Sequence, residues 1–493
     1  MTLYISYIII IIYSLSLLMI FLYSLSQLSL LRNYIQSKKH KDDNCLFDLA
    51  NAAEVPSVTV QLPVYNEKYV IERLLHCISR LDYPKSKLQI QVLDDSTDDS
   101  VVLTMNIVAQ LKEKGFNIDH VRRNLRTEFK AGALKEGLQK ASGEFIAIFD
   151  ADFLPEPDWL KRAVIYFKDT EVGVVQSRWG HLNLNYSTLT KIQAFALDAH
   201  FTLEQAGRNA KNYFINFNGT AGIWRKQCIL DAGNWMGATL TEDLDLSYRA
   251  QLKKWKFKYV EDLVTPAELP VAISAARSQQ FRWNKGGAEN FMKYFRRILR
   301  SKSMSFSTKV HGFLHLANSS MFLFVLILAV LSVPMLYIKN KYQHLAIIFE
   351  INSLFIVSTL ILFICHWVSY KNTHEKKSWR FVRYIRMFFT FFTIALGFSW
   401  HNSVAVMEAY RGKKSDFIRT PKFNVTVKTD NWKDNIYLAG KISLNVIIET
   451  ILLLYFGFGI ASAFLVKDYA LLPFHIMLIT GFSYVVYHSI NND

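Results

Sequence analysis

The feature that most constrains the fold of this chain is an apolar segment at its amino terminus. Residues 3–30 carry no charged side chain and are long enough, as a helix, to cross a lipid bilayer. A secretory signal would have a shorter apolar core with basic residues in front of it. Here the basic residues Arg32, Lys38, Lys39 and Lys41 follow the apolar segment. The positive-inside rule therefore predicts that the amino terminus lies outside and that the next domain lies in the cytoplasm.

Further apolar segments lie in the carboxyl-terminal half. We expect membrane spans over residues 313–337, 345–370, 444–466 and 471–490. Residues 387–399 are also apolar, but they are few for a span and lie between two basic clusters, which predicts an interfacial or re-entrant segment. The favoured arrangement has five spans with the carboxyl terminus inside. The alternative has six spans and places the basic loop 411–441 outside.

The composition agrees with a membrane protein. The net charge is +16, from 57 basic and 41 acidic residues. Basic residues beside membrane spans bind anionic lipid, so we expect the lipid bilayer as a partner and no nucleic acid. Four cysteines, at positions 45, 77, 228 and 365, have no metal-ligand spacing and indicate a reducing compartment.

Residues 56–285 have the pattern of a soluble α/β domain. Apolar runs at 57–62, 88–93, 116–121 and 145–152 read as strands, and helical patterns such as 131–140 lie between them. Alternating strands and helices predict a doubly wound, mostly parallel sheet.

Acidic residues follow two of these strands. Asp94 and Asp95 end the second run, and Asp150 and Asp152 end the run at 145–152. Ligands of open α/β sheets bind beside the carboxyl ends of the strands. Two carboxylates separated by one small residue can hold Mg²⁺ against a diphosphate. The signal is weak alone, because acids at strand ends are also common as helix caps or solvated loop residues.

A basic segment lies between the two acid clusters. Residues 130–134 (KAGAL) begin a helix after Arg122, Arg123 and Arg126. A helix amino terminus beside a lysine suits a phosphate, although a solvated basic helix would have the same composition. The chain lacks both the GxGxxG dinucleotide fingerprint and the GxxxxGK[ST] phosphate loop, which argues against a dehydrogenase and an ATPase.

Three later motifs could also contact a ligand. Residues 218–222 (NGTAG) suit a close backbone approach or a plain turn. Residues 241–245 (TEDLD) open a helix, where acids also complement the helix dipole. Residues 279–283 (QQFRW) offer a cation and a flat ring, which suit a diphosphate and a sugar. An amphipathic basic helix to residue 300 follows, and we expect it to lie in the bilayer interface.

The order of four of these motifs resembles the membrane-bound family 2 glycosyltransferases of the cellulose-synthase superfamily. The motifs are Asp94-Asp95, Asp150-Ala151-Asp152, Thr241-Glu242-Asp243 and Gln279-Gln280-x-Arg282-Trp283. Three segments are similar in sequence to motifs of plant cellulose-synthase-like mannan/glucan synthases and their bacterial relatives. They are residues 61–67 (QLPVYNE), 130–137 (KAGALKEG) and 219–222 (GTAG). The resemblance implies a GT-A-type nucleotide-sugar-binding domain joined to an α-helical transmembrane domain.

The resemblance also implies roles for individual residues. Asp243, with Glu242 beside it, would be the catalytic base that takes the proton of the acceptor hydroxyl. Asp150 and Asp152 would bind Mg²⁺ or Mn²⁺. The implied substrate-binding residues are Tyr65, Glu67, Asp95, Lys130, Asp150, Gly219, Thr220, Gln279, Gln280, Arg282 and Trp283. The similar tetrapeptide at 176–179 has one residue too few between glutamine and arginine and receives no such role.

The basic loop 411–440 contains two similar hexapeptides. Residues 423–428 (FNVTVK) resemble the FxVTxK gating loop of cellulose synthases, and residues 417–422 (FIRTPK) have the same outline. The expected gating residues are Phe423, Val425, Thr426 and Lys428, with Thr420 and Lys422 from the first hexapeptide. A cytoplasmic gating loop favours five spans, whereas a loop that only binds lipid is the alternative. His401, Asn402 and Glu408 are candidates to line a polymer path.

These observations predict a processive, inverting β-glycosyltransferase. It would polymerise a β-glucan or β-mannan from a nucleotide sugar, UDP-glucose or GDP-mannose, and pass the growing polysaccharide acceptor through its own spans. One alternative is a non-processive enzyme that acts on ceramide or polyprenyl phosphate. Another is an inactive channel or nucleotide sensor. Nothing in the sequence identifies accessory subunits.

The expected domains follow in chain order. They are a transmembrane helix (1–31), a basic linker (32–55), a cytoplasmic GT-A domain (56–285), an amphipathic interfacial helix (286–311) and a transmembrane domain (312–493) with an interfacial segment (381–410) and a gating-type loop (411–440).

Overall fold

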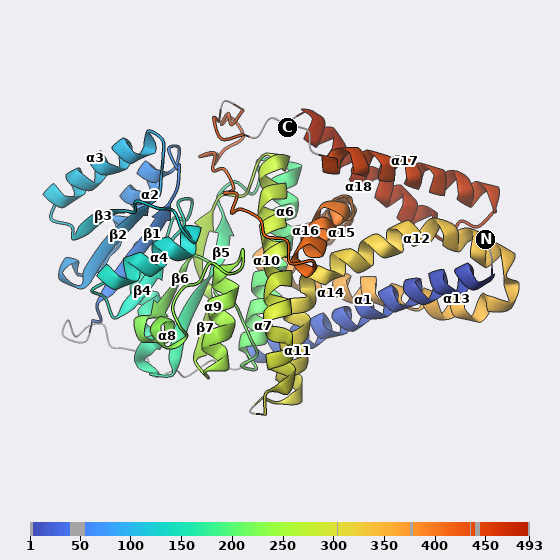
Figure 1. Cartoon of the computed structure of the whole chain (residues 1–493), viewed down its shortest axis with the longest axis horizontal. Helices are drawn as coiled ribbons and strands as arrows, with labels where there is room; N and C mark the ends of the chain where they lie inside the picture. The colour runs from blue at the N-terminus through green and yellow to red at the C-terminus, as the bar shows by residue number, and fades with distance from the viewer. Residues whose placement is uncertain are drawn as a thin grey trace.

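The computed structural model has a sheet domain at one end and long helices at the other (Figure 1). It describes residues 3–39, 55–302, 304–374, 378–433, 435–438 and 444–491. Most of the expected linker, including Cys45, lies outside the described residues.

The sheet has seven strands in the order β3-β2-β1-β4-β6-β5-β7. Their bounds are β1 Val58–Val64, β2 Leu88–Asp94, β3 Ile118–Arg122, β4 Phe145–Ile148, β5 Val172–His181, β6 Gly222–Arg225 and β7 Lys256–Ala267. Strand β6 runs antiparallel to β4 and β5, and the other neighbouring pairs are parallel. The predicted mostly parallel α/β sheet is therefore confirmed.

Strand β1 continues past the residue at which we expected it to end. Pro63 has no backbone N–H and is poorly tolerated between two paired strands. Strand β4 pairs with β1 only as far as Gln61, so Pro63 lies where one side of β1 has no β4 partner. Strand β4 itself ends at Ile148, so Asp150 and Asp152 lie in the turn that follows it.

Helices cover both faces of the sheet. One hydrophobic core packs α2, α3 and α5 against the sheet, and a second packs α4, α8 and α9 against its other face. The helices of this part are α2 Ile71–Ile78, η1 Lys85–Lys87, α3 Ser100–Glu113, α4 Phe129–Lys140, α5 Trp159–Val164, η2 Ile165–Lys168, α6 Thr188–Ala199, the π-helical turn η3 His200–Gln205, α7 Ala206–Asn209, α8 Lys226–Asp231, α9 Glu242–Leu252 and α10 Ile273–Arg300.

The topology brings several loops to one edge of the sheet. Strands β1, β2, β4, β5 and β7 all run in the same direction, so the residues that follow them meet at their carboxyl edge. Because β6 is antiparallel to β4, its first residue, Gly222, lies opposite Ile148 at this edge. The turn 218–221 therefore joins the residues that follow the parallel strands.

Helix α10 separates the sheet domain from the long helices, and it lies crosswise to them together with α6 (Figure 1). We expected a helix to begin after Trp283, but α10 begins at Ile273, so the QQFRW motif lies within the helix. One side of α10 contacts the sheet domain, where the Tyr294 hydroxyl donates to Asp245 of α9 (2.6 Å). The other side contacts α17, where Arg277 pairs with Glu449 (2.7 Å).

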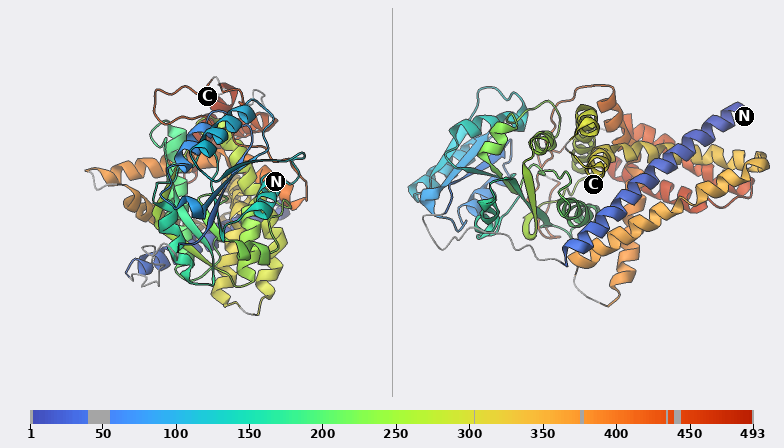
Figure 2. Two further views of the ribbon diagram at one scale, coloured as in Figure 1. Left: turned by 90° about the vertical axis from the view of Figure 1, so that its left-hand side faces the viewer. Right: turned by 90° about the horizontal axis from the view of Figure 1, so that it is seen from below.

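The long helices form the other end of the molecule, and the start of α1 lies far from the sheet (Figure 2). Their bounds are α1 Leu3–Ser37, α11 Phe306–Leu316, η4 Ala317–Ser320, α12 Met321–Lys341, η5 Gln343–Leu345, α13 Ala346–Ser353, α14 Ile356–Thr373, α15 Arg380–Gly397, α16 Ser399–Tyr410, α17 Leu444–Leu465 and α18 Leu472–Asn491.

Four helical segments in the described part of the chain are long and apolar enough to cross a membrane: Leu3–Ser37, Phe306–Lys341, Gln343–Thr373 and Leu444–Leu465. Helices α15 and α16 form a pair bent by 51°, which is a broken span or a re-entrant loop. The expected span at 471–490 corresponds to α18, which is not among the four. Among the described residues the candidates are therefore four segments and one bent pair, compared with the five spans expected.

Helices α15 and α18 cross at two glycines, and this contact yields a prediction about stability. A Cβ atom on Gly481 would lie 2.1 Å from the carbonyl oxygen of Thr393, and one on Gly397 would lie 2.2 Å from that of Gly481. We expect Gly481→Ala to destabilise the chain by about 1–3 kcal/mol, because the backbones must separate. The midpoint of thermal unfolding in detergent measures the effect. Gly457→Ala is the matched control, since nothing lies within 4 Å of its Cβ position. Equal midpoints for both variants would contradict the close crossing.

Candidate active site

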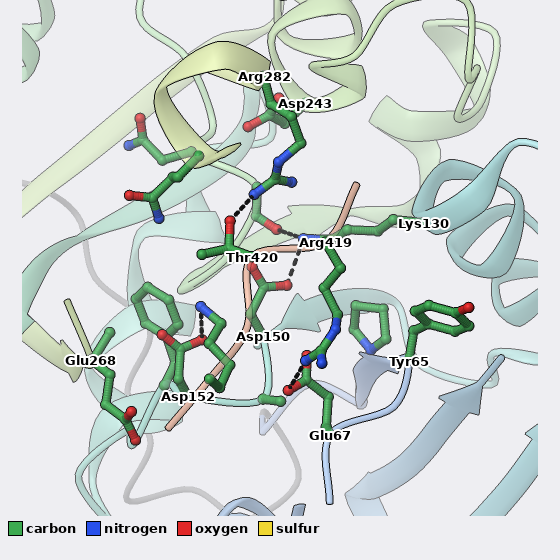
Figure 3. A pocket seen from close by; sticks show the side chains of 18 of the residues that line it. Tyr65, Glu67, Lys130, Asp150, Asp152, Asp243, Glu268, Arg282, Arg419 and Thr420 are labelled. Atoms are coloured by element: carbon green, nitrogen blue, oxygen red, sulfur yellow. Dashed lines mark hydrogen bonds and ion pairs between the residues drawn. The ribbon is translucent and has the colours of Figure 1, made fainter. Parts of the chain in front are cut away.

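A cavity of about 160 Å³ lies at the carboxyl edge of the sheet. Most of the residues singled out in the sequence line it (Figure 3). They are Tyr65, Glu67, Asp95, Lys130, Asp150, Asp152, Gly219, Glu242, Asp243, Gln279, Arg282, Trp283, Thr420 and Lys422. Thr220 lies behind the wall, where its hydroxyl accepts the backbone N–H of Asp150 (2.8 Å).

Lys130 supplies a fixed positive charge at the start of α4. Its ammonium donates to Asp150 (2.6 Å) and to the carbonyl oxygen of Gly219 (2.9 Å). Burial alone would lower the pKa of Lys130, but the charge of Asp150, together with that of Glu242, raises it above its ordinary value. Lys130 therefore stays cationic and suits a bound diphosphate.

Two arginines complete the end of the cavity that holds Tyr65 and Asp95. The Arg126 guanidinium lies 3.4 Å from the centre of the Tyr65 ring. Arg123 binds Asp95 with two hydrogen bonds, one of them from Nε to Oδ1 (2.9 Å). Both arginines belong to the basic cluster noted in the sequence, which indicated no partner for either of them. A flat cation on an aromatic ring and a fixed carboxylate are groups that can contact a nucleoside.

Asp243 and Glu242 lie beside each other at the start of α9, where Glu242 is buried and Asp243 is half-buried. Burial, together with the negative charge of Glu242, raises the pKa of Asp243 to about 7. Gly219 lies opposite, and a Cβ atom there would be 3.1 Å from Oδ2 of Asp243. Its φ of +79° also favours glycine. A carboxyl group with a pKa near neutrality, facing an open space, suits a general base.

Asp150 and Asp152 offer oxygen ligands of the kind that Mg²⁺ and Mn²⁺ prefer. Asp152 is only 1% exposed, and its Oδ1 lies 2.8 Å from the ammonium of Lys422. Across the residues that the structure describes, no group of three or more His, Cys, Asp or Glu side chains is placed to hold a metal ion. Two carboxylates fit a cation whose other ligands come from phosphate and water.

The first hexapeptide of the basic loop lies across the cavity (Figure 3). Arg419 points to Glu67 (2.6 Å), while Thr420 points the other way and accepts a hydrogen bond from Arg282 (2.7 Å). The Arg282 guanidinium also lies 4.6 Å from the centre of the Phe417 ring. Residues 417–422 therefore form a lid, and we use this name for them below.

The second hexapeptide lies beside the cavity. Phe423 and Val425 are buried in a small core with Trp432, whereas Thr426 and Lys428 are exposed. None of these four residues lines the cavity as the structure describes it. The two hexapeptides, which the sequence could not distinguish, thus occupy different places.

Two residues that the sequence did not indicate hold the chain just after the lid. The carboxylate of Glu268 accepts the backbone N–H groups of Phe423 (3.3 Å) and Val425 (3.4 Å). Arg73 pairs with Glu268 and donates to the side-chain oxygen of Asn424 (2.8 Å). Glu268 follows β7, so an acid after a strand was the available signal. Arg73 lies on the amphipathic helix α2, and no feature of the sequence indicated its contact with Glu268.

A second cavity of about 400 Å³ adjoins the first. Asn218, Asp243 and Trp283 line both cavities. Its wall is mainly apolar, with contributions from Leu189, Ile192, Phe201, Phe322, Phe391, Ile394 and Phe398. Gln280 also lines it and accepts a hydrogen bond from Asn402 (2.9 Å).

Two other candidates for a polymer path have protein partners instead. His401 contacts the backbone carbonyl of Arg277 (2.9 Å), and Glu408 pairs with Lys285 (2.9 Å). Asn402 is thus the member of the predicted trio that the structure brings to the wall of the second cavity.

A comparison with known families identifies the sheet domain. The family described as "Glycosyltransferase like family 2" matches residues 56–286. Residues 56–286 are a family 2 glycosyltransferase domain. The resemblance predicted from the sequence motifs is therefore confirmed, and every predicted catalytic, substrate-binding and metal-binding residue lies within this domain.

Curated relatives of this chain are named as mannosyltransferases. The chain is 42% identical over 265 residues to glucomannan 4-beta-mannosyltransferase 2 of Arabidopsis thaliana, covering 53% of this chain and 50% of that protein. It is 40% identical over 261 residues to glucomannan 4-beta-mannosyltransferase 1 of Oryza sativa subsp. japonica, covering 52% and 50%. The chain thus matches about half the length of these relatives.

A solved structure shares the fold of the glycosyltransferase. It is the mannosyltransferase PcManGT from Pyrobaculum calidifontis in complex with GDP-Man and Mn²⁺. The match has a TM-score of 0.52 at 17% sequence identity and covers 80% of this chain and 100% of the other. At this identity the likeness concerns the fold alone, and it agrees with a GT-A-like domain.

Proposed function

We propose that this chain is a membrane-bound, inverting β-glycosyltransferase that extends a polysaccharide processively and passes it through its membrane helices. One observation carries the proposal. Asp243 and Trp283 border both a charged cavity suited to a nucleotide sugar and an apolar cavity that continues toward the long helices. The product would be of the β-mannan or β-glucan type.

In this proposal Asp243 takes the proton from the acceptor hydroxyl. The hydroxyl oxygen then attacks the anomeric carbon of the donor sugar, and the bond from that carbon to the diphosphate breaks on the opposite face. Lys130 and Arg282 hold the negative charge of the departing diphosphate. A divalent cation held by Asp150 and Asp152 would neutralise part of the same charge. The acceptor oxygen displaces the diphosphate directly, so no sugar–enzyme bond forms.

The names of the relatives favour a mannose donor. The two relatives described above are both named as 4-beta-mannosyltransferases. We therefore infer that a nucleotide mannose such as GDP-mannose is the first donor to test, with UDP-glucose second. Tyr65, Asp95 and Arg126 would contact the nucleoside, and Lys130 the diphosphate.

We also propose an orientation in the membrane. The glycosyltransferase domain lies in the cytoplasm, with the amphipathic part of α10 and the start of α11 (286–311) at the bilayer surface. The transmembrane part begins near residue 312, and the loop 411–440 stays on the cytoplasmic side. The lid, which is part of this loop, contacts Glu67, Asp152 and Arg282 of the glycosyltransferase domain, and these contacts support a cytoplasmic position for the loop.

Membranes that contain the full chain test this function. They are supplied with Mg²⁺ or Mn²⁺ and a panel of labelled nucleotide sugars, and the product is sized and digested with linkage-specific hydrolases. A long polymer from one donor is expected, with no incorporation by Asp243→Asn. A short product that dissolves in organic solvent would instead indicate a lipid acceptor, for which the apolar wall of the second cavity would also be suited. No incorporation from any donor would contradict the proposal.

The buried carboxyl of Asp243 predicts an acid limb in the pH profile. The base must be ionised, and burial beside Glu242 raises its pKa to about 7. We expect kcat/KM for the donor to fall about tenfold for each pH unit below 7. An aspartate with an ordinary pKa would leave the profile flat in this range.

The variant Glu242→Gln tests whether Asp243 is the group whose titration produces the acid limb. Removal of the neighbouring negative charge lowers the pKa of Asp243, so the acid limb is expected to move to lower pH. Burial also raises the pKa of Glu67 to about 7, but the charges that act on Glu67 come from Arg419, Lys422 and Asp152. A limb that does not move in Glu242→Gln would assign the titration to another group.

A further inference from the structure

A largely buried carboxylate, that of Glu204, lies where the helical segment formed by α6, η3 and α7 departs from α-helical geometry. The π-helical turn η3, His200–Gln205, separates α6 from α7. Such turns are rare and often occur at functional sites. Glu204 in this turn has four side-chain partners. Tyr23 (3.3 Å) and Gln27 (3.0 Å) donate hydrogen bonds to it, Nδ1 of His200 lies at hydrogen-bond distance (3.0 Å), and Arg208 forms an ion pair with it (3.3 Å).

Two of these donors come from the amino-terminal helix. Tyr23 and Gln27 lie on α1, which also packs closely on α7, where a Cβ atom on Gly207 would lie 2.5 Å from the carbonyl oxygen of Leu30. Burial alone would raise the pKa of Glu204, but Arg208 and His200 lower it below its ordinary value. Glu204 is therefore an ionised anchor that joins α1 to η3.

His200 is oriented by this anchor toward the second cavity. Its Nδ1 bonds to Glu204, so its Nε2 points to the other side, 3.5 Å from the side-chain oxygen of Asn218. The side chain is 26% exposed and lines the cavity. Two histidines of α11 also contact a protein hydroxyl with one ring nitrogen: His311 contacts Ser29 of α1 (3.2 Å), and His315, which lines the second cavity as well, contacts Tyr248 (2.8 Å).

The wall next to His200 contains unpaired polar atoms. Asn218 borders both cavities, and its side-chain nitrogen is buried with no hydrogen-bond partner among the described residues. The side-chain oxygen of Asn216, in the same wall, is also unpaired within the described part of the chain. His200, Asn216 and Asn218 all line the second cavity, and side chains of these types can exchange hydrogen bonds with a ligand rich in hydroxyl groups.

We propose that His200, oriented by Glu204 and through it by α1, binds a hydroxyl group of the acceptor sugar at the boundary between the two cavities. Asn218 contacts the same sugar, and both place it beside Asp243, which also borders the second cavity. The inference rests on the proposed glycosyl transfer. It makes the amino-terminal helix a part of the acceptor site as well as a membrane anchor.

The variant His200→Gln tests this role, with His311→Gln as the matched control. The purified full chain receives the donor sugar that wild type incorporates and the matching β-linked oligosaccharide as acceptor. Two rates are measured: sugar added to the acceptor and nucleoside diphosphate released in total. We expect His200→Gln to raise the KM for the acceptor about tenfold, through the loss of one hydrogen bond, while the KM for the donor stays within about twofold.

The division between the two rates identifies an acceptor-binding role. Diphosphate release by transfer to water should continue in His200→Gln, so that the ratio of sugar added to diphosphate released falls. The α1 variant Gln27→Met should change the same ratio in the same direction by a smaller factor. His311→Gln should leave both rates at the wild-type level.

Other outcomes would overturn the inference. If the acceptor KM of His200→Gln equals that of His311→Gln, His200 does not bind the acceptor. If the acceptor KM, the donor KM and thermal stability all change together, His200 only supports the fold. A wild-type chain that neither adds sugar nor releases diphosphate would refute the proposed function, and this inference with it.

Discussion

Replacement of Asp243 by Asn is expected to lower the rate of sugar transfer by about 10²–10⁴, the usual contribution of a general base. The amide keeps the shape of the carboxylate but cannot accept the proton of the acceptor hydroxyl. Its backbone contact with α9 is unaffected, since the side-chain oxygen can still accept the N–H of Leu244. The measurement is the initial rate of labelled-sugar incorporation at pH 8, with donor and acceptor at saturation.

The same variant should not be less stable than wild type. Because burial raises the pKa of Asp243 in the folded state above its value in the unfolded chain, its ionisation opposes folding as the pH rises toward 7. At pH 8 the neutral amide avoids this cost, so the midpoint of thermal unfolding should equal or exceed that of wild type. Asp99→Asn is the matched control, because Asp99 is exposed and lies outside the cavity. A lower midpoint together with lost activity would attribute the loss to unfolding.

Replacement of Arg282 by Gln is expected to reduce the rate by about 10²–10³, the cost of removing one preorganised positive group from a site of developing negative charge. Arg282 is half-buried and feels the negative charges of Glu242 and Asp150, donates to Thr420 of the lid and lies over the Phe417 ring. The substitution thus removes both the charge beside the diphosphate and a contact that holds the lid. Diphosphate release at saturating donor measures the effect.

Two further variants test how much of the effect comes from the positive charge of Arg282 and how much from the shape of its guanidinium group. Arg282→Lys keeps the charge but loses the planar fork, so an intermediate rate is expected. Arg300→Gln makes the same change at the exposed end of α10 and should leave the rate unchanged. Similar rates for wild type and Arg282→Gln would exclude Arg282 from the handling of the diphosphate.

The sequence predicted those parts of the fold that depend on local patterns. Apolar runs followed by acids located β2 and β4, and the alternation of strands and helices predicted a mostly parallel sheet. The start of α10 was misjudged, because residues 273–282 mix polar and small residues and their helical form depends on contacts with the sheet domain and α17. The bend between α15 and α16 likewise depends on packing, which hydropathy alone does not register.

The candidate site, like the fold, could be predicted only in part from the sequence. Asp150, Asp152 and Asp243 could be predicted because each belongs to a motif at the end of a strand or the start of a helix. The place of the lid could not, because Arg419 and Glu67 are far apart in sequence and only the fold brings them together. For the same reason the sequence could not show that Arg73 and Glu268 hold the chain beside the lid.

The separation of these partners has a consequence for biosynthesis. Arg73 and the residue it holds beside the lid, Asn424, are 351 positions apart, and α15 and α16 come between the glycosyltransferase domain and the lid in the chain. On the ribosome, Tyr65, Asp95 and Asp150, which follow strands β1, β2 and β4, are made long before the lid emerges. The pocket therefore gains its cover only after most of the helical half has been synthesised, so a partly made chain has the domain without the enclosed site.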